Sequence, residues 1–183
     1  MFARTPRLLL RPGFPEDAPA LAAAMSDVAI ARNLAIVPWP YGLRDAEAFL
    51  ASPRDPVLPS LLIFERSNGA PQLVGSCGLG RRPSGAVEMG YWIARHCWSR
   101  GFATEACTAL IEIGRSLGLA SIEGAHFLDN PGSARVLEKL GFEPIGIVAP
   151  RHSCARGTDV PARLMRLRLL RSSAEPEEEP LAA

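Results

Sequence analysis

Apolar and polar residues alternate along this chain in a way that predicts strands and helices in a mixed order. An apolar run at residues 8–11, closed by Pro-Gly, predicts a first strand. Helices are expected next at residues 15–25, 28–34 and 44–51. The Pro-Trp-Pro-Tyr-Gly run at residues 38–42 interrupts them, because proline does not fit inside a helix.

Three β-type runs follow at residues 61–65, 73–79 and 87–93, and the short turns between them predict an antiparallel meander. The remaining pattern alternates helix and strand. Helices are expected at residues 104–117 and 133–140, and strands at 121–127, 143–148 and 164–170.

Hairpins that precede strand–helix–strand units are typical of an α+β (mixed α/β) fold. We therefore expect one domain over residues 5–171, built on a mixed, mostly antiparallel sheet with helices on both faces. The glutamate-rich residues 172–183 are expected to form a disordered acidic tail.

Charge and cysteine content narrow the choice of function. The 183 residues include 20 Lys and Arg against 19 Asp and Glu, and four of the acids lie in the tail, so the domain carries a mild positive excess. Such an excess fits an anionic ligand, whereas the lack of a dense basic run excludes a nucleic-acid surface. The four cysteines have no C-x-x-C spacing, so we expect reduced thiols and no metal site. The sequence shows no signal-peptide or membrane-span pattern, and we therefore expect a cytoplasmic protein.

The segment between the strand at 87–93 and the helix at 104–117 carries the most chemical information. Ser99, Gly101 and Ala103 are small, and free N–H groups at a helix start bind phosphate well. Arg100 adds a positive charge. The alternative is a tight turn with an exposed arginine. Neither the P-loop nor the G-x-G-x-x-G pattern is present, which disfavours ATP and dinucleotide binding.

Three ordered segments resemble the GNAT superfamily of N-acetyltransferases: VEMGYWI at 87–93, WSRGFATEA at 98–106 and NPGSARVLEKLGF at 130–142. The branch of ribosomal-protein alanine and serine N-acetyltransferases is the most similar, and the opening TPRLLLR at 5–11 also resembles it. The resemblance covers roughly residues 5–170.

This resemblance implies a sheet splayed at its fourth strand and a binding site for acetyl-CoA. The pantetheine arm would pair with the backbone of Trp92, Ile93 and Ala94, and would also meet Asn130 and Ser133. The pyrophosphate would rest on the loop formed by Trp98, Ser99, Arg100, Gly101, Phe102, Ala103 and Thr104. Two residues depart from the common pattern: Trp98 replaces Gln or Arg, and Leu137 replaces a tyrosine that serves many members as acid.

Three groups are candidates for the chemistry of acetyl transfer. Glu88 is the candidate base, acting through water, or else a structural carboxylate. A backbone N–H of Trp92 or Ile93 would stabilise the oxyanion. Ser133 resembles the serine proposed as the acid or thiol partner in that branch, although a serine there also suits helix capping. Asn130 before Pro131 is typical of a helix N-cap.

The sequence therefore predicts direct acetyl transfer from acetyl-CoA to a primary amine, by a monomer or homodimer. The acceptor is expected to be a protein N-terminal α-amine or a small-molecule amine. An α-amine needs little help to lose its proton, because its pKa is about 8. Trp39, Tyr41 and Tyr91 are expected to line the acceptor side, unless they are core aromatics. A non-catalytic CoA- or acyl-CoA-binding module and a nucleotide-binding regulatory domain are the alternatives.

Overall fold

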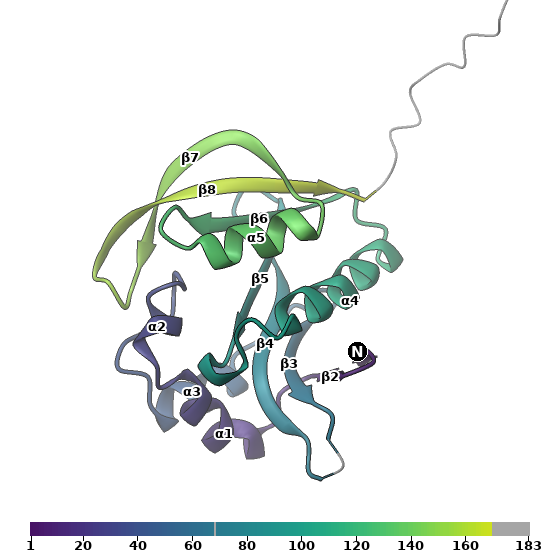
Figure 1. Cartoon of the computed structure of the whole chain (residues 1–183), viewed down its shortest axis with the longest axis vertical. Helices are drawn as coiled ribbons and strands as arrows, with labels where there is room; N and C mark the ends of the chain where they lie inside the picture. The colour runs from purple at the N-terminus through teal and green to yellow at the C-terminus, as the bar shows by residue number, and fades with distance from the viewer. Residues whose placement is uncertain (68, 170–183) are drawn as a thin grey trace, which may run out of the picture.

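The computed structural model describes residues 1–67 and 69–169, which form one eight-stranded sheet with helices on both faces (Figure 1). The strand order is β1-β2-β3-β4-β5-β6-β8-β7, and only β5 and β6 pair in parallel. The predicted mixed, mostly antiparallel sheet is confirmed. The strands are β1 (Ala3–Arg4), β2 (Leu8–Arg11), β3 (Ser60–Glu65), β4 (Gln72–Arg81), β5 (Val87–Ile93), β6 (Ser121–Phe127), β7 (Glu143–Ser153) and β8 (Thr158–Arg168). The helices are α1 (Ala18–Met25), α2 (Val28–Ala31), α3 (Leu43–Ala51), α4 (Phe102–Ser116) and α5 (Pro131–Lys139), with 3-10 turns η1 (Pro15–Asp17) and η2 (Arg95–Cys97).

Helices α4 and α5 cover one face of the sheet and enclose the larger core. Helix α4 buries a stripe at helical spacing, because Phe102, Ala106 and Leu110 all face the strands. Strand β5 alternates, and directs every second side chain to this face. Its residues Val87, Met89 and Ile93 belong to this core.

Helices α1 and α3 cover the opposite face over β3 and β4. Leu21 and Met25 of α1 pack with Ala46 of α3 against Leu62 and Phe64. The helix expected at residues 28–34 is shorter in the structure, where α2 ends at Ala31. The buried strand residues of this second, smaller core are Leu62 and Phe64 of β3 and Leu73 of β4.

The sheet splays between β5 and β6. These strands share a single register pair, Glu88 with Glu123. Beyond it, β5 stays paired with β4 as far as Ile93, and β6 stays paired with β8 as far as Phe127. The expected splay at the fourth strand is therefore present. That strand is numbered β5 because the two-residue strand β1 precedes the four longer ones. The far half of β5 faces the splay with no strand beside it among the described residues.

Strands β7 and β8 form a longer hairpin than the sequence predicts. The expected strands covered 143–148 and 164–170, whereas β7 runs on to Ser153 and β8 begins at Thr158. Pro150 and Pro161 lie opposite each other in this extension. Proline is tolerated because β7 is an edge strand and Pro161 lies beyond the last β6 pair. Residue 170 lies outside the described residues.

The domain boundary at 171 and the acidic tail at 172–183 also lie outside the described residues. Within residues 1–67 and 69–169, no helix has the length and apolar character needed to cross a membrane.

Candidate active site

The loop between β5 and α4 has a backbone that is shaped for an anion. Two residues adopt positive φ angles, Ser99 at 61° and Gly101 at 80°. Left-handed residues next to right-handed ones turn successive N–H groups toward one point. No described residue accepts a hydrogen bond from the backbone N–H groups of residues 99–104. The loop thus offers six unpaired donors where the 15-residue helix α4 begins.

The side chain of Arg100 does not point its charge freely into this loop. Its guanidinium forms two hydrogen bonds with the carboxylate of Glu65 at the end of β3, and stacks over the ring of Phe102. Because Glu65 compensates the charge, any anion at this loop would be held mainly by the backbone N–H groups. Arg95 stacks on Trp98 at 4.4 Å from the ring centroid, beside the same loop.

The free edge of β5 supplies backbone groups next to the loop. The N–H of Ala94 donates to Val74 on β4, at 2.8 Å. Since backbone groups alternate along a strand, those of Trp92 also face β4, and those of Tyr91 and Ile93 face the splay. Of the two expected oxyanion donors, the geometry therefore favours Ile93. Its carbonyl accepts a 2.7 Å hydrogen bond from Nε1 of Trp98.

The start of α5 reaches the same splay from the β6 side. Asn130 is the N-cap, because its Oδ1 accepts a hydrogen bond from the N–H of Ser133 at 3.1 Å. The Ser133 hydroxyl lies 2.8 Å from the hydroxyl of Tyr91. Burial raises the pKa of Tyr91 well above its usual range. Tyr91 and Ser133 thus bridge β5 and α5 across the splay as neutral hydroxyl groups.

Leu137 belongs to the core. It is buried, and it packs so closely on Gly124 of β6 that a Cβ there would lie 3.0 Å from Cδ2 of Leu137. This position therefore supplies no acid, in agreement with the departure seen in the sequence.

Glu88 lies at the apex of the splay on the face opposite α4 and α5. Its two carboxylate oxygens accept hydrogen bonds from Arg151 of β7 at 2.6 and 3.0 Å. Arg82 forms a further ion pair with Glu88 at 3.0 Å. Glu123, the register partner of Glu88 on β6, forms an ion pair with Arg166 at 2.8 Å. Two guanidinium groups thus hold Glu88, which supports its structural interpretation and leaves a role as base as a prediction.

The predicted acceptor residues do not gather on one face. Tyr41 packs with the α1 and α3 core, and Trp39 lies in the loop before α3 with 39% of its surface exposed. Burial, together with the charge of Asp45, raises the pKa of Tyr41 to about 12. Tyr91 packs instead against the α4 core on the other face. Period-two alternation with Met89 and Ile93 was the sequence signal that would have placed it there.

The sheet face that carries Glu88 is bare next to that residue. Gly80 and Gly90 occupy neighbouring strands, and a Cβ added to either would meet no atom within 4 Å. Among the described residues, side chains therefore leave the backbone of this part of β4 and β5 uncovered.

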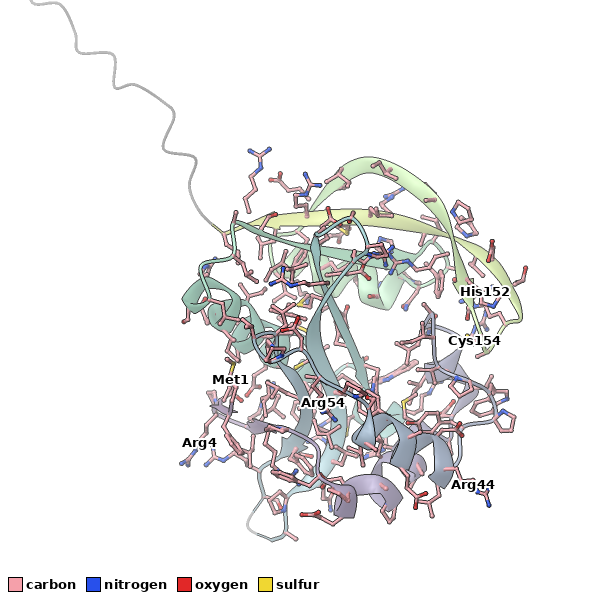
Figure 2. All side chains as sticks on the ribbon, turned by 180° about the vertical axis from the view of Figure 1, so that it is seen from behind. Met1, Arg4, Arg44, Arg54, His152 and Cys154 are labelled. Atoms are coloured by element: carbon pink, nitrogen blue, oxygen red, sulfur yellow. The ribbon has the colours of Figure 1, made fainter. Side chains whose placement is uncertain are left out.

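The tip of the β7–β8 hairpin clasps α2, a contact that the sequence did not predict. Arg156 donates to the carbonyl of Arg32 at 2.7 Å and forms a bidentate ion pair with Asp129. The N–H of Cys154 donates to the carbonyl of Ala35 at 2.9 Å. Figure 2 shows Cys154 and His152 at this tip, beside the α2 segment. The clasp joins the two halves of the splayed sheet.

The described residues also line two surface hollows. One, of about 540 Å³, lies between the end of α1 and the start of β4, and Arg95 and His96 line it. The other, of about 330 Å³, lies between β2 and the turn after β3. Within the described part of the chain, no three His, Cys, Asp or Glu side chains are grouped to hold a metal ion.

With this geometry in place, comparison with known proteins identifies the family. Residues 7–143 match the acetyltransferase (GNAT) domain. The chain belongs to the GNAT family of acetyltransferases. This GNAT acetyltransferase is 30% identical over 153 residues to an uncharacterized N-acetyltransferase, p20, from Bacillus licheniformis. That alignment covers 79% of this chain and 83% of the relative.

Solved structures share the fold of this GNAT acetyltransferase. The microcin C7 self-immunity acetyltransferase MccE, in complex with acetyl-CoA and AMP, is 15% identical, with a TM-score of 0.75 and coverage of 90% of this chain and 93% of that one. RimJ of Mycobacterium smegmatis, in complex with CoA-disulfide, is 19% identical, with a TM-score of 0.73 and coverage of 88% and 81%. Family membership favours an acetyltransferase over the binding-module and nucleotide-binding alternatives.

Proposed function

We propose that this acetyltransferase uses acetyl-CoA and delivers the acetyl group to a peptide α-amine or a small-molecule amine. One observation carries the proposal: the six unpaired N–H groups at residues 99–104 lie directly after the free edge of β5. The loop would hold the pyrophosphate, and the strand edge would align the pantetheine arm. MccE and RimJ, which share the fold, bind acetyl-CoA and a CoA derivative respectively, which supports this choice of cofactor.

In the proposed reaction, the neutral amine attacks the thioester carbonyl directly and no covalent enzyme intermediate forms. The new C–N bond replaces the C–S bond, and the surplus proton of the nitrogen passes to the departing thiolate, which gives the amide and the CoA thiol. The N–H of Ile93 faces the splay and would donate to the developing oxyanion. A thiol has a pKa of about 8.5, so the thiolate can leave without help from a strong acid. Ser133 is proposed as its hydrogen-bond partner, and the buried core residue Leu137 is then no obstacle to catalysis.

The acceptor class follows from the same chemistry. A lysine side chain has a pKa of about 10.4 and needs an efficient base, whereas an α-amine is partly neutral near pH 7.5. Because Arg82 and Arg151 hold the candidate base Glu88, an acceptor that needs little deprotonation is favoured. The likeness of the sequence to ribosomal-protein N-acetyltransferases agrees with a peptide N-terminus.

The test combines calorimetry with CoA and a thiol-release assay against peptides and amines. We expect CoA to bind and at least one α-amine to release the thiol from acetyl-CoA. Gly101→Asp should weaken CoA binding about 100-fold or more, because it adds negative charge beside the pyrophosphate. Gly85→Asp is the matched control, since Gly85 has the same positive φ in a distant turn. Unchanged CoA affinity in folded Gly101→Asp protein would disprove the loop assignment.

A further inference from the structure

One carboxylate joins the N-terminal turn to the first turn of α4. Oε1 of Glu105 accepts hydrogen bonds from the hydroxyl of Thr5 at 2.6 Å and from the N–H of Arg7 at 2.9 Å. Oε2 accepts from Nε of Arg7 at 2.7 Å. Burial works to raise the pKa of Glu105, but the donors from Thr5 and Arg7 outweigh it and hold that pKa below its usual range. Glu105 is thus held as a charged anchor.

Arg7 continues from this anchor onto the loop itself. Its Nη1 donates to the carbonyl of Arg100 at 2.9 Å, and its guanidinium lies 4.8 Å from the centroid of the Phe102 ring. Its Nη2 lies 3.4 Å from the place a Cβ on Gly101 would take. One side chain from the N-terminal turn therefore lies against three consecutive loop residues.

The contact with the Arg100 carbonyl determines where a neighbouring donor points. In a trans peptide, C=O and N–H point in opposite directions from one plane. When Arg7 holds the carbonyl of Arg100, the N–H of Gly101 is turned away from Arg7, where no described residue accepts from it. The bond thus orients one of the six free donors.

We propose that Arg7, held by Glu105 and Thr5, is a positioning residue that fixes the loop for the diphosphate of the CoA cofactor. This inference rests on the proposed function. Arg100, the cation expected from the sequence, pairs with Glu65, whereas Arg7 braces the backbone that binds the ligand. The rigid guanidinium fork matters, since it engages Glu105 and the Arg100 carbonyl at once.

Arg7→Ala tests the proposal in calorimetry with CoA. The loss of the charge-assisted bonds should raise the Kd for CoA about tenfold or more. Arg7→Lys should recover only part of this affinity, because an ammonium cannot reproduce the fork. Arg66→Ala is the matched control: Arg66 donates to the carbonyls of Thr5 and Pro6 in the same turn, at 3.0 and 3.2 Å. We expect that control to stay within about twofold of wild type.

Pantetheine, which lacks the diphosphate, separates positioning from general loosening. Its affinity, followed by ligand-observed NMR at millimolar concentration, should be the same for wild type and Arg7→Ala. Equal losses for CoA and pantetheine, or unchanged CoA affinity in folded Arg7→Ala protein, would overturn the proposal. If Arg7→Ala does not fold, the affinities of Arg7→Lys for CoA and for pantetheine are compared in the same way. Failure of the wild type to bind CoA would instead overturn the proposed function, and the inference with it.

Discussion

At the scale of single residues, Glu88 combines a catalytic prediction with a structural environment. Its carboxylate meets Arg151 and Arg82, and it stands where β5 leaves β6. The two guanidinium groups occupy the carboxylate oxygens that would have to take the proton from an amine. Turnover and CoA affinity of a variant with a neutral side chain of the same shape separate a role as base from a structural role.

Glu88→Gln is expected to lower turnover about tenfold or more at pH 7 while the affinity for CoA changes little, because a base acts on the amine and not on the cofactor. Glu123→Gln is the control, since Glu123 lies on the neighbouring strand and is also paired with an arginine. Turnover equal to that of wild type at neutral pH would exclude Glu88 as the base.

At the scale of the element, the site depends on how closely β4 approaches β5. Gly75 lies opposite Ile93, and a Cβ there would lie 2.3 Å from the carbonyl oxygen of Trp92. That oxygen is backbone and cannot rotate away. Any side chain at position 75 therefore displaces the strand whose other edge faces the splay.

Gly75→Ala should destabilise the protein by about 1–3 kcal/mol through overpacking, and should weaken CoA binding because the edge of β5 shifts. Gly80→Ala, on the same strand with no atom within 4 Å of its added Cβ, should stay within about 0.5 kcal/mol. Urea unfolding and calorimetry measure the two effects. A Gly75→Ala protein as stable as the Gly80→Ala protein would show that β4 and β5 move apart without cost.

At the scale of the whole molecule, the splayed sheet is closed by the β7–β8 hairpin. Arg156 has only 14% of its side chain exposed, and it ties the hairpin tip to Asp129 and to the carbonyl of Arg32. Ser153 is fully buried in the same contact. The two sheet halves are thus linked both at the apex of the splay and at its open side.

Arg156→Ala should lower the free energy of unfolding by about 1–3 kcal/mol, because hydrogen bonds to a charged group are lost and Asp129 keeps partial access to water. Arg163→Ala, an exposed position on the same strand β8, is the control and should change stability by less than about 0.5 kcal/mol. Equal stability of the two variants in urea would show that the clasp contributes nothing.

Local signals predicted most of the fold and the position of the helix start after the loop at residues 98–104, whose role in binding stays a prediction. The small residues at 99, 101 and 103, followed by a helical stripe, predicted a helix start with free donors, which the backbone of the loop reproduces. The hairpin extension was missed because Pro150 and Pro161 interrupt the strand pattern, and their tolerance depends on which strand lies at the edge.

Local sequence patterns could not predict the contacts between distant parts of the chain. Thr5 and Arg7 meet Glu105 only because β2 begins near the start of α4, and no periodicity records that proximity. The pairing of Glu88 with Arg151 likewise depends on the curvature of the hairpin. Tyr91 is different, since strand alternation alone could have assigned it to the α4 face.

The indole of Trp98 has a practical consequence. Its N–H is bonded to Ile93, its ring lies against Arg95, and 39% of its surface is exposed beside the anion loop. Indole emission responds to the polarity and charge around the ring, so the protein carries its own fluorophore where the cofactor would arrive. If a ligand reaches this loop, the fluorescence of Trp98 should change, and this change can be measured without a label and before any acceptor is known.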